Sequence, residues 1–344
     1  MFLTDFTPSQ LQDWVVSLGE PAFRAQQLRH WLYRSLEADV RNMANLPEGL
    51  RTKLAERTCV SSLSPLGHVR SVDGQTEKTL FALPDGQTIE SVLMRYEARQ
   101  TICVSTQVGC PIGCSFCATG QSGYERDLTA GEIIDQVLHF ARLLKPEGLS
   151  VTNVVYMGMG EPLLNYEAVW QSIEVLHDSQ TLAVGSRRFT ISTAGVVPGI
   201  DRLGEEPLQV GLAISLHAPD DELRNRLVPL NRKYPLGALL AACHRYVRRA
   251  DRRITFEYAL IDGVNDELAA AHKLVELLRG LPAHINLIPL NPTADSPYRA
   301  SRRDRVVAFH RALRQQGMKV TLRLRRGIGI SAGCGQLRSQ ASSQ

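Results

Sequence analysis

The sequence predicts an α/β fold in which parallel strands and helices alternate and curl into a full or partial barrel. Three observations support this prediction. From residue 101 onward, strand-like runs alternate with helical segments. The length of 344 residues suits one large domain with a small accessory domain, and the hydrophobic content of 44% supports a full core. Because such barrels bind ligands at the carboxyl ends of their strands, we expect functional residues to follow the strands.

A small helical unit is expected over residues 1–62. Thr7 can cap a helix over 8–18, and apolar residues recur at helical spacing through 22–36. The polar side of this second helix carries Arg24, Gln26, Arg29 and Arg34. The unit is therefore a candidate RNA-contacting accessory domain, while its apolar residues are expected to form a core.

A β-rich linker region is expected over residues 63–100. Its clearest signal is a hairpin, in which 78–83 and 87–94 flank the turn Pro-Asp-Gly at 84–86. The alternating region that follows should supply the strands and helices of the barrel.

The barrel domain is expected over residues 101–338, followed by a disordered polar tail over 339–344. Thr129 and Glu132 form a capping box, which marks the start of its first long helix. The expected strands cover 101–107, 151–157, 188–193, 210–216, 253–261, 284–290 and 319–325. The expected helices cover 129–144, 166–177, 236–249, 267–279 and 303–316.

Charge is distributed unevenly along the chain. The whole protein carries +4, but the window 299–326 holds ten Lys or Arg residues and one acid, a net +9, which leaves −5 elsewhere. A second cluster consists of Arg245, Arg248, Arg249, Arg252 and Arg253. Concentrated arginine suits a phosphate backbone, whereas a solvated helix face is the usual alternative. Charge alone leaves both interpretations open.

The apolar stretches are too short to span a bilayer, and the N-terminus shows no targeting pattern. The chain has seven cysteines, an odd number, which argues for reduced thiols rather than a disulfide framework. We therefore expect a soluble cytoplasmic protein that does not associate with membranes.

The most informative motif contains Cys110, Cys114 and Cys117 within one loop of eight residues. Three thiolates can bind one iron–sulfur cluster, and a missing fourth thiolate leaves one iron open to a small molecule. A structural zinc site would usually need a second pair of ligands, and the other cysteines, Cys59, Cys103, Cys243 and Cys334, are single. The spacing resembles the signature of radical S-adenosylmethionine (SAM) enzymes, which implies a [4Fe–4S] cluster and SAM.

Polar residues follow several predicted strands. Gly160 and Glu161 lie in a glycine-rich turn, where the backbone can approach a ligand and the carboxylate can accept from an ammonium group. After the cysteine motif, this turn resembles the one that holds the amino group of SAM. The other candidate SAM contacts are Ser192, Ser215, Leu216, His217 and Asn291. Each alone could simply cap the following loop or helix, but their convergence at one end of a barrel favours a ligand site.

Four stretches together resemble the RlmN/Cfr family of radical-SAM RNA methyltransferases. They are residues 103–120, 158–165, 215–217 and 334–337. The resemblance covers nearly the whole chain and implies a partial (β/α) barrel of radical-SAM type that methylates an adenine ring carbon in 23S rRNA, tRNA or both. It also implies two SAM molecules per turnover, an electron donor such as flavodoxin, and action as a monomer.

The resemblance also assigns roles to single residues. One SAM would methylate a cysteine that matches Cys334, and a second would be cleaved to a 5′-deoxyadenosyl radical that activates this methyl for addition to adenine. A second thiol, matching Cys103, would release the product through a transient disulfide with Cys334. Glu90 matches the family carboxylate that accepts a proton from the ring, and its alternative is an exposed hairpin carboxylate.

The terminal motif departs from the family pattern. Glycine stands at 329 and 333, where we expect an acidic residue and alanine, and this predicts a more mobile loop. The basic window precedes the loop directly, so RNA phosphates are expected near Arg323, Arg325 and Arg326.

The site of methylation and two other classes of function stay open. Pro162 and the segment 286–289 look more RlmN-like, which favours carbon 2 of adenine over the Cfr-like carbon 8. A radical-SAM enzyme acting on a protein or small molecule would not need Cys103 and Cys334. A metal-stabilised RNA-binding protein would not cleave SAM.

Overall fold

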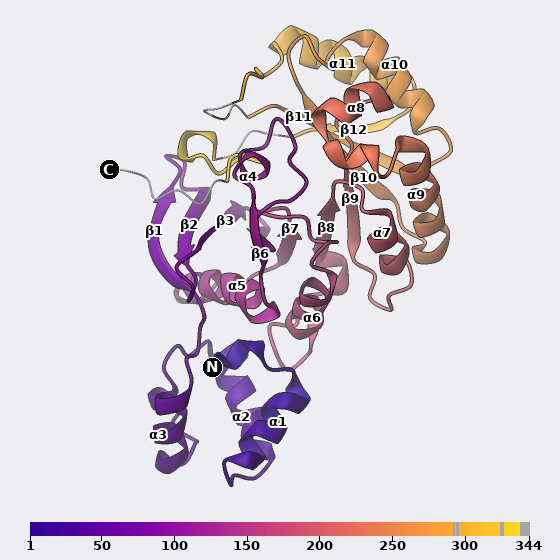
Figure 1. Cartoon of the computed structure of the whole chain (residues 1–344). Coiled ribbons are helices and arrows are strands. Elements are labelled where there is room, and N and C mark those ends of the chain that lie inside the picture. Colours follow the sequence, from indigo (N-terminus) through magenta and orange to yellow (C-terminus); the bar gives the residue numbers. More distant parts are fainter. Residues whose placement is uncertain (292, 294–295, 324–326, 338–344) are drawn as a thin grey trace.

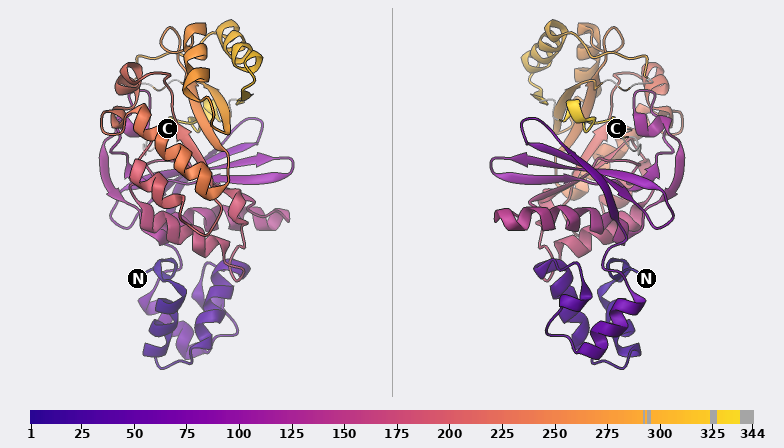
Figure 2. Two further views of the ribbon diagram at one scale, coloured as in Figure 1. Left: turned by 90° about the vertical axis from the view of Figure 1, so that its right-hand side faces the viewer. Right: turned by 90° about the vertical axis from the view of Figure 1, so that its left-hand side faces the viewer.

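The computed structural model describes residues 1–291, 293, 296–323 and 327–337. A helical N-terminal unit lies at one end of the molecule, and helices from the last third of the chain lie at the other (Figures 1 and 2). Some predictions fall outside the described residues. They concern the phosphate contacts of Arg325 and Arg326, the end of the last predicted strand and the tail 339–344.

The N-terminal unit is built on buried leucines that the short helices bring together, among them Leu28, Leu50 and Leu54. Thr7 starts the first helix through a capping box with Gln10, as the sequence indicates. The second predicted helix is shorter than expected, because it changes to a π-helical turn at Trp31. The elements are η1 Leu3–Asp5, α1 Pro8–Ser17, α2 Phe23–His30, η2 Trp31–Ser35, η3 Val40–Asn42 and α3 Glu48–Arg57.

The basic side of this unit helps to attach it to the barrel. Arg29 pairs with Asp178 at 2.5 Å, and Arg34 donates to the carbonyl of Ser179. These two arginines are therefore engaged within the protein, at the end of helix α6 (Tyr166–His177).

Within the described residues, ten strands form one sheet in the order β1-β2-β3-β4-β7-β8-β9-β10-β11-β12. The strands β1 to β4 pair antiparallel, and all pairs from β4 to β12 are parallel. This arrangement confirms the predicted α/β class with a large parallel sheet. Their bounds are β1 Ser64–Arg70, β2 Thr76–Ala82, β3 Thr88–Tyr96, β4 Arg99–Cys103, β7 Asn153–Tyr156, β8 Phe189–Thr193, β9 Gly211–Ser215, β10 Ile254–Leu260, β11 Ala283–Pro289 and β12 Lys319–Leu322.

Helices follow the parallel strands and cover the outer face of the sheet (Figure 1). Thr129 starts the first long helix through the expected capping box with Glu132. Two helices of seven residues each, α7 (Val197–Leu203) and α8 (Asp221–Leu227), were not expected from the sequence. The helices are α4 Ala118–Gln121, α5 Ala130–Leu144, η4 Lys145–Glu147, α6, η5 Ser186–Arg188, α7 Val197–Leu203, α8 Asp221–Leu227, η6 Pro229–Arg232, α9 Leu236–Ala250, α10 Leu268–Leu277, α11 Arg303–Gln315 and η7 Ile328–Ile330.

The predicted strand over 101–107 is interrupted. β4 ends at Cys103, and a separate two-stranded ribbon, β5 (Gln107–Gly109) with β6 (Tyr124–Asp127), begins four residues later. Between them the backbone turns towards the β7 end, where the amide of Thr106 donates to the carbonyl of Met159 at 2.8 Å. This turn carries the cysteine loop away from the sheet and over its carboxyl end.

None of the helices in the described part of the chain combines the length and apolar character that crossing a bilayer requires.

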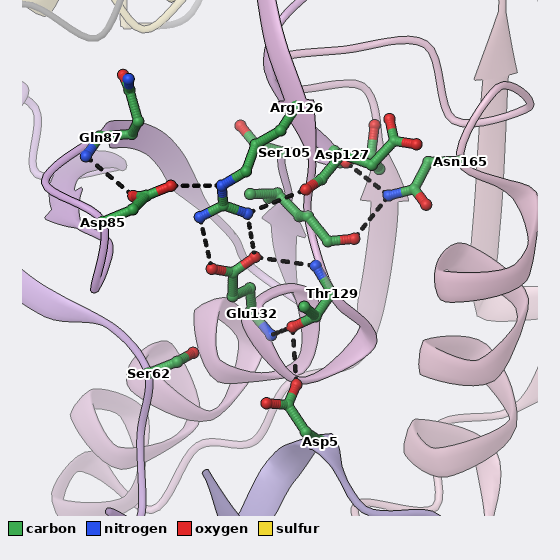
Figure 3. A network of polar contacts seen from close by, with 12 residues as sticks. Asp5, Ser62, Asp85, Gln87, Ser105, Arg126, Asp127, Thr129, Glu132 and Asn165 are labelled. Carbon is green, nitrogen blue, oxygen red and sulfur yellow. Dashed lines mark hydrogen bonds and ion pairs between the residues drawn. The ribbon is translucent and has the colours of Figure 1, made fainter. Parts of the chain in front are cut away.

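A polar network built on Arg126 joins the ribbon, the hairpin and α5 (Figure 3). Its guanidinium contacts Asp85 at 2.5 Å and forms two bonds of 2.8 Å with Glu132. Thr129 extends the network to the N-terminal unit by donating to Asp5 at 2.7 Å. The network therefore ties the ribbon that carries the cysteine loop to the rest of the protein.

We expect Arg126→Met to lower the free energy of unfolding by about 1–2 kcal/mol, because it leaves the largely buried Glu132 without its bidentate partner. Arg279→Met is the matched control, since its ion pair with Glu276 is exposed and should contribute little. Thermal unfolding of both variants checks the difference, and equal melting temperatures would show that the network does not stabilise the fold.

Candidate active site

One cavity lies at the carboxyl ends of the parallel strands, as expected for this class of barrel. Eleven of the thirteen residues proposed from the sequence line it. They are Cys103, Cys110, Cys114, Cys117, Gly160, Glu161, Ser192, Ser215, His217, Asn291 and Cys334. Leu216 lies in the core instead, and Glu90 is buried on β3, two residues before the lining residue Val92.

The cysteine loop is held from both sides. The amide of Cys110 donates to Gly123 at 2.7 Å, and the amide of Ser115 donates to Leu227 at the end of α8 at 3.1 Å. Glycine is required at 120, where a Cβ would lie 2.8 Å from the backbone nitrogen of Cys114. The sequence thereby keeps the three thiols on one side of a short, compact loop.

The donor set fits an iron–sulfur cluster better than a single metal ion. Burial raises the pKa of Cys110 to about 12 and raises the pKa values of Cys114 and Cys117, so each thiol must lose a proton when it binds a metal. Among the described residues, no three His, Cys, Asp or Glu side chains converge as ligands of one ion. Three thiols that line one cavity, from a loop without a fourth cysteine, match the donors of a cluster with one open iron.

Glu161 presents a buried carboxylate at the β7 end of the cavity. It accepts the amide hydrogens of Ala194 at 2.7 Å and Leu163 at 3.2 Å. Burial raises its pKa to about 7, against these hydrogen bonds, which lower it. Gly160 is needed beside it, because its φ is +102° and a Cβ would lie 2.6 Å from Gln107. The turn can therefore place a carboxylate and bare backbone next to a ligand.

His217 is neutral and its tautomer is fixed. Burial and the charge of Arg224 lower its pKa to about 3, and its Nδ1 accepts the amide hydrogen of Ala259 at 3.0 Å. Nε2 must then carry the proton and can act as a donor. The ring meets Phe116 edge to face at 4.9 Å, which links β9 to the cysteine loop.

Arg224 does not line the cavity but supports the strand ends that do, a role that the sequence did not reveal. It is fully buried and donates to the carbonyls of Ala194 at 2.6 Å, Ser215 at 3.1 Å and Leu216 at 3.1 Å. It thus fixes the ends of β8 and β9, where Ser192 and Ser215 lie 3.4 Å apart. Nothing in the local sequence separates this buried arginine from the exposed Arg226 two residues later.

Cys103 and Cys334 come from distant parts of the chain and line the same cavity. Burial raises the pKa of Cys103 to about 12; the neighbouring Cys334 raises it further, and Arg323 opposes the shift. Arg323 was expected to lie along an RNA phosphate path, but it lines this cavity, 3.9 Å from the carboxylate of Glu257. Glu257 lies in the middle of a predicted strand, and nothing in the sequence indicated that it would line the cavity and pair with Arg323.

The Cys334 loop is packed more tightly than its glycines indicate. The amide of Ala118 donates to Gly335 at 2.8 Å, and Asn291 donates to the carbonyl of Cys334 at 3.2 Å. A Cβ at Gly333 would lie 2.6 Å from the Asn291 side chain. Glycine at 333 is therefore explained by close packing against Asn291. At Gly329, by contrast, a Cβ would meet open space.

Glu90 is not an exposed hairpin carboxylate, so that alternative from the sequence is wrong. The residue is 3% exposed and pairs with Lys78 at 2.6 Å. It shares a face of β3 with Val92 and Met94, which line the cavity. The carboxylate therefore lies on the cavity-facing side of β3, two residues from the lining residue Val92.

The second arginine cluster is largely engaged with local partners. Arg245 pairs with Asp201 at 2.7 Å, and Arg249 pairs with Glu205 at 2.6 Å. These contacts favour the interpretation of this cluster as a solvated helix face. Exposed arginines of α11, namely Arg303, Arg311 and Arg314, remain better candidates for contact with phosphates.

Two family models match the chain. The Radical SAM superfamily model matches residues 104–275, and the model of the ribosomal RNA large subunit methyltransferase N-terminal domain matches residues 1–60. The two matches cover the cysteine loop with most of the parallel sheet and the helical N-terminal unit.

Similar proteins match over almost their whole length. A protein of Chloroflexus aurantiacus named probable dual-specificity RNA methyltransferase RlmN is 46% identical over 99% of this chain and 93% of its own. A ribosomal RNA large subunit methyltransferase N of Nitrosopumilus maritimus is 44% identical over 96% and 97%. The crystal structure of a radical SAM methyltransferase from Sphaerobacter thermophilus has a TM-score of 0.97 and 52% identity, over 99% of this chain and 100% of that one.

Proposed function

Because the chain belongs to the RlmN family of radical SAM RNA methyltransferases, we propose that it methylates carbon 2 of an adenine in 23S rRNA, tRNA or both. The observation that supports this most strongly is that Cys103 and Cys334 line one cavity with the three cysteines of the loop. A radical SAM enzyme with a protein or small-molecule substrate would need the loop but not this pair of thiols. An RNA-binding protein without catalysis would need neither. Methylation of carbon 8 is the alternative within the family.

In this proposal Cys110, Cys114 and Cys117 hold a [4Fe–4S] cluster, and Glu161 accepts a hydrogen bond from the amino group of SAM. When bound, the cluster would supply one electron for the reductive cleavage of SAM and would take one back when the adenine adduct loses its ring proton. Gly160, Ser192, Ser215, His217 and Asn291 are proposed to contact the rest of SAM, whereas Leu216 lies in the core behind them. Two SAM molecules are consumed in each turnover, and an electron donor such as flavodoxin is expected in the reducing cytoplasm.

Cys334 and Cys103 are proposed to carry the methyl group and to release the product, respectively. Cys334 takes a methyl group from one SAM and later joins its methylene carbon to the adenine ring. Glu90 accepts the proton that leaves the ring carbon. The thiolate of Cys103 then attacks the sulfur of Cys334, so that a disulfide forms and the carbon–sulfur bond breaks. The electron pair of that bond stays on the carbon, which takes a proton and becomes the product methyl group.

Nucleoside mass spectrometry after anaerobic reconstitution tests the proposed reaction. The holoenzyme, SAM and a reductant are incubated separately with 23S rRNA and with tRNA, and digests are compared with 2-methyladenosine and 8-methyladenosine standards. Only 2-methyladenosine supports the proposal. The appearance of 8-methyladenosine would favour the alternative, and cleavage of SAM without any RNA modification would point to another substrate class.

The affinity for SAM is expected to rise with pH through the range around 7. The carboxylate of Glu161, whose pKa lies near 7 in the free protein, must be ionised to attract an ammonium group. Below that value the acid is neutral, so affinity should fall by roughly tenfold per pH unit. Equilibrium dialysis with the reconstituted protein at pH 6–8 measures this, and Glu161→Gln should remove that part of the dependence. An identical pH profile in the variant would contradict the role of Glu161.

The RNA base must leave its stack to reach the cavity, while the surrounding phosphates meet the protein surface. Residues 1–62 are proposed as an accessory RNA-contacting domain, 63–100 as a linker and 101–338 as the catalytic domain, in a protein acting as a monomer. The exposed arginines of α11 and the basic segment before Cys334 are the best candidates for contact with phosphate.

RNA binding is expected to weaken steeply with salt, by at least about tenfold between 50 and 200 mM, because bound phosphates release counterions. Replacing Arg303, Arg311 and Arg314 by serine should reduce the affinity and the slope against salt concentration. The matched control replaces Arg245 and Arg249, whose charges are already paired. Filter binding at several salt concentrations makes the comparison, and equal slopes in both variants would exclude α11 from the RNA surface.

A further inference from the structure

Lys78 connects two parts of the candidate site that lie far apart in the sequence. It extends from β2, and its ammonium lies 2.6 Å from the carboxylate of Glu90 on β3. The same nitrogen donates to the backbone carbonyl of Ser331 at 3.4 Å. Ser331 is three residues from Cys334. One side chain therefore contacts both the proposed proton acceptor and the loop that carries the methylated thiol.

The β2 face around Lys78 is shaped to receive that loop. A Cβ at Gly327 would lie 2.9 Å from Thr76, the residue two positions before Lys78 on the same face of the strand. Ala332 closes the turn by donating its amide hydrogen to Gly327 at 2.8 Å, and it lines the cavity beside Cys334. The contact with Lys78 is thus part of a packed interface and not a single stray hydrogen bond.

The chemistry of the ammonium group suits this double contact. The side chains of Lys78 and Glu90 are 12% and 4% exposed, so the carboxylate needs a nearby compensating charge. An ammonium group has three hydrogens and can serve a carboxylate and a carbonyl at the same time. Loss of Lys78 would remove one contact from the loop and one from the carboxylate at the same time.

We propose that Lys78 is a positioning residue for the methyl-transfer reaction: it fixes Glu90 and, through Ser331, the Cys334 loop, so that proton acceptor and methylated thiol face the adenine in one arrangement. This inference rests on the proposed function. In the step concerned, the carbon–hydrogen bond of the ring breaks, the proton passes to a carboxylate oxygen of Glu90, and the electron pair of the bond stays with the ring. The unpaired electron that radical addition left on the ring would return to the bound cluster. Lys78 takes no part in the covalent change.

The inference separates two stages of the reaction. The first SAM methylates Cys334 before the enzyme reacts with RNA. This first stage needs no proton acceptor at Glu90. Removal of the ring proton needs Glu90 at a defined place. Loss of Lys78 should therefore spare the first stage and slow the second.

The test uses reconstituted holoenzyme and four variants: Lys78→Met, Lys78→Arg, Glu90→Gln, and Lys78→Met combined with Glu90→Gln. Arg95→Met is the matched control, because Arg95 lies on β3 and forms an ion pair with Glu147, whose side chain is 46% exposed. Peptide mass spectrometry measures the methylation of Cys334 without RNA. Denaturing gels and nucleoside analysis then measure the RNA adduct and the methylated product.

We expect Lys78→Met to methylate Cys334 as wild type does, to form product about 10–100-fold more slowly, and to accumulate the adduct. Lys78→Arg should recover most of the rate. The double variant should be no slower than Glu90→Gln alone, because both changes affect one step. Product formation by Lys78→Met equal to that of Arg95→Met would overturn the inference, as would a parallel loss of Cys334 methylation. A wild-type enzyme that neither methylates Cys334 nor modifies RNA would instead overturn the proposed function.

Discussion

Replacing Cys103 with alanine is expected to stop turnover and to leave the protein covalently attached to its RNA. In the proposed mechanism the adduct between Cys334 and adenine is broken only by a thiolate that attacks the Cys334 sulfur. Cys103 lines the cavity with Cys334, and the two thiols interact electrostatically. Alanine keeps the packing of β4 but removes the nucleophile, so the rate of product release should fall by at least about 10³-fold.

A denaturing gel with labelled RNA measures the adduct directly. Cys243→Ala is the control, because Cys243 is a free, fully buried cysteine on α9 that does not line the cavity. The control should release methylated RNA normally. Multiple turnovers by Cys103→Ala, without a shifted band, would show that another group resolves the adduct.

Replacing Arg224 with methionine is expected to lower the free energy of unfolding by about 3–5 kcal/mol and to abolish tight binding of SAM. The arginine donates to three carbonyls at the ends of β8 and β9, those of Ala194, Ser215 and Leu216, and the Leu216 carbonyl also accepts from the amide of Ala218 at 2.8 Å. It also binds the side chain of Asn231 at 2.8 Å. Since these carbonyls belong to the turns that carry Glu161's partner Ala194 and the residues Ser215 and Leu216, the ligand site should lose its shape.

Arg226→Met tests the same substitution on the same helix, at an exposed position. Its stability and SAM affinity should match those of the wild type within about 0.5 kcal/mol. Chemical denaturation and SAM binding by both variants make the comparison. If Arg224→Met bound SAM with normal affinity, the strand-end carbonyls would not need the arginine to hold the site.

Local signals in the sequence predicted most elements. Helix α6 has the predicted bounds, Thr129 forms the expected capping box, and Thr7 caps the first helix as expected. Such signals depend on residues three or four positions apart. The strand predicted over 101–107 was wrong in its second half, because the backbone bond from Thr106 to Met159 depends on a turn more than fifty residues away.

In the site, too, residues in local motifs could be predicted and residues that depend on distant contacts could not. The cysteine loop and Glu161 could be predicted as site residues because each belongs to a short motif of neighbouring residues. Arg224, Glu257 and Lys78 could not, since their roles arise from burial and from partners on other elements. Burial also corrected the expectation for Glu90, which the hairpin pattern left with an exposed alternative. The steric need for Gly333 became visible only when Asn291 was placed beside it.

The transfer of the methyl group through Cys334 is the central claim, and its isotopic composition tests that claim most directly. The holoenzyme would be supplied with SAM that carries three deuterium atoms on its methyl group, and the RNA product would be analysed by nucleoside mass spectrometry. Passage through Cys334 requires the loss of one deuterium before the carbon reaches adenine and the gain of one proton when Cys103 releases it. A product methyl with two deuterium atoms and one hydrogen is therefore expected, whereas a methyl that keeps all three deuterium atoms would contradict the proposed route.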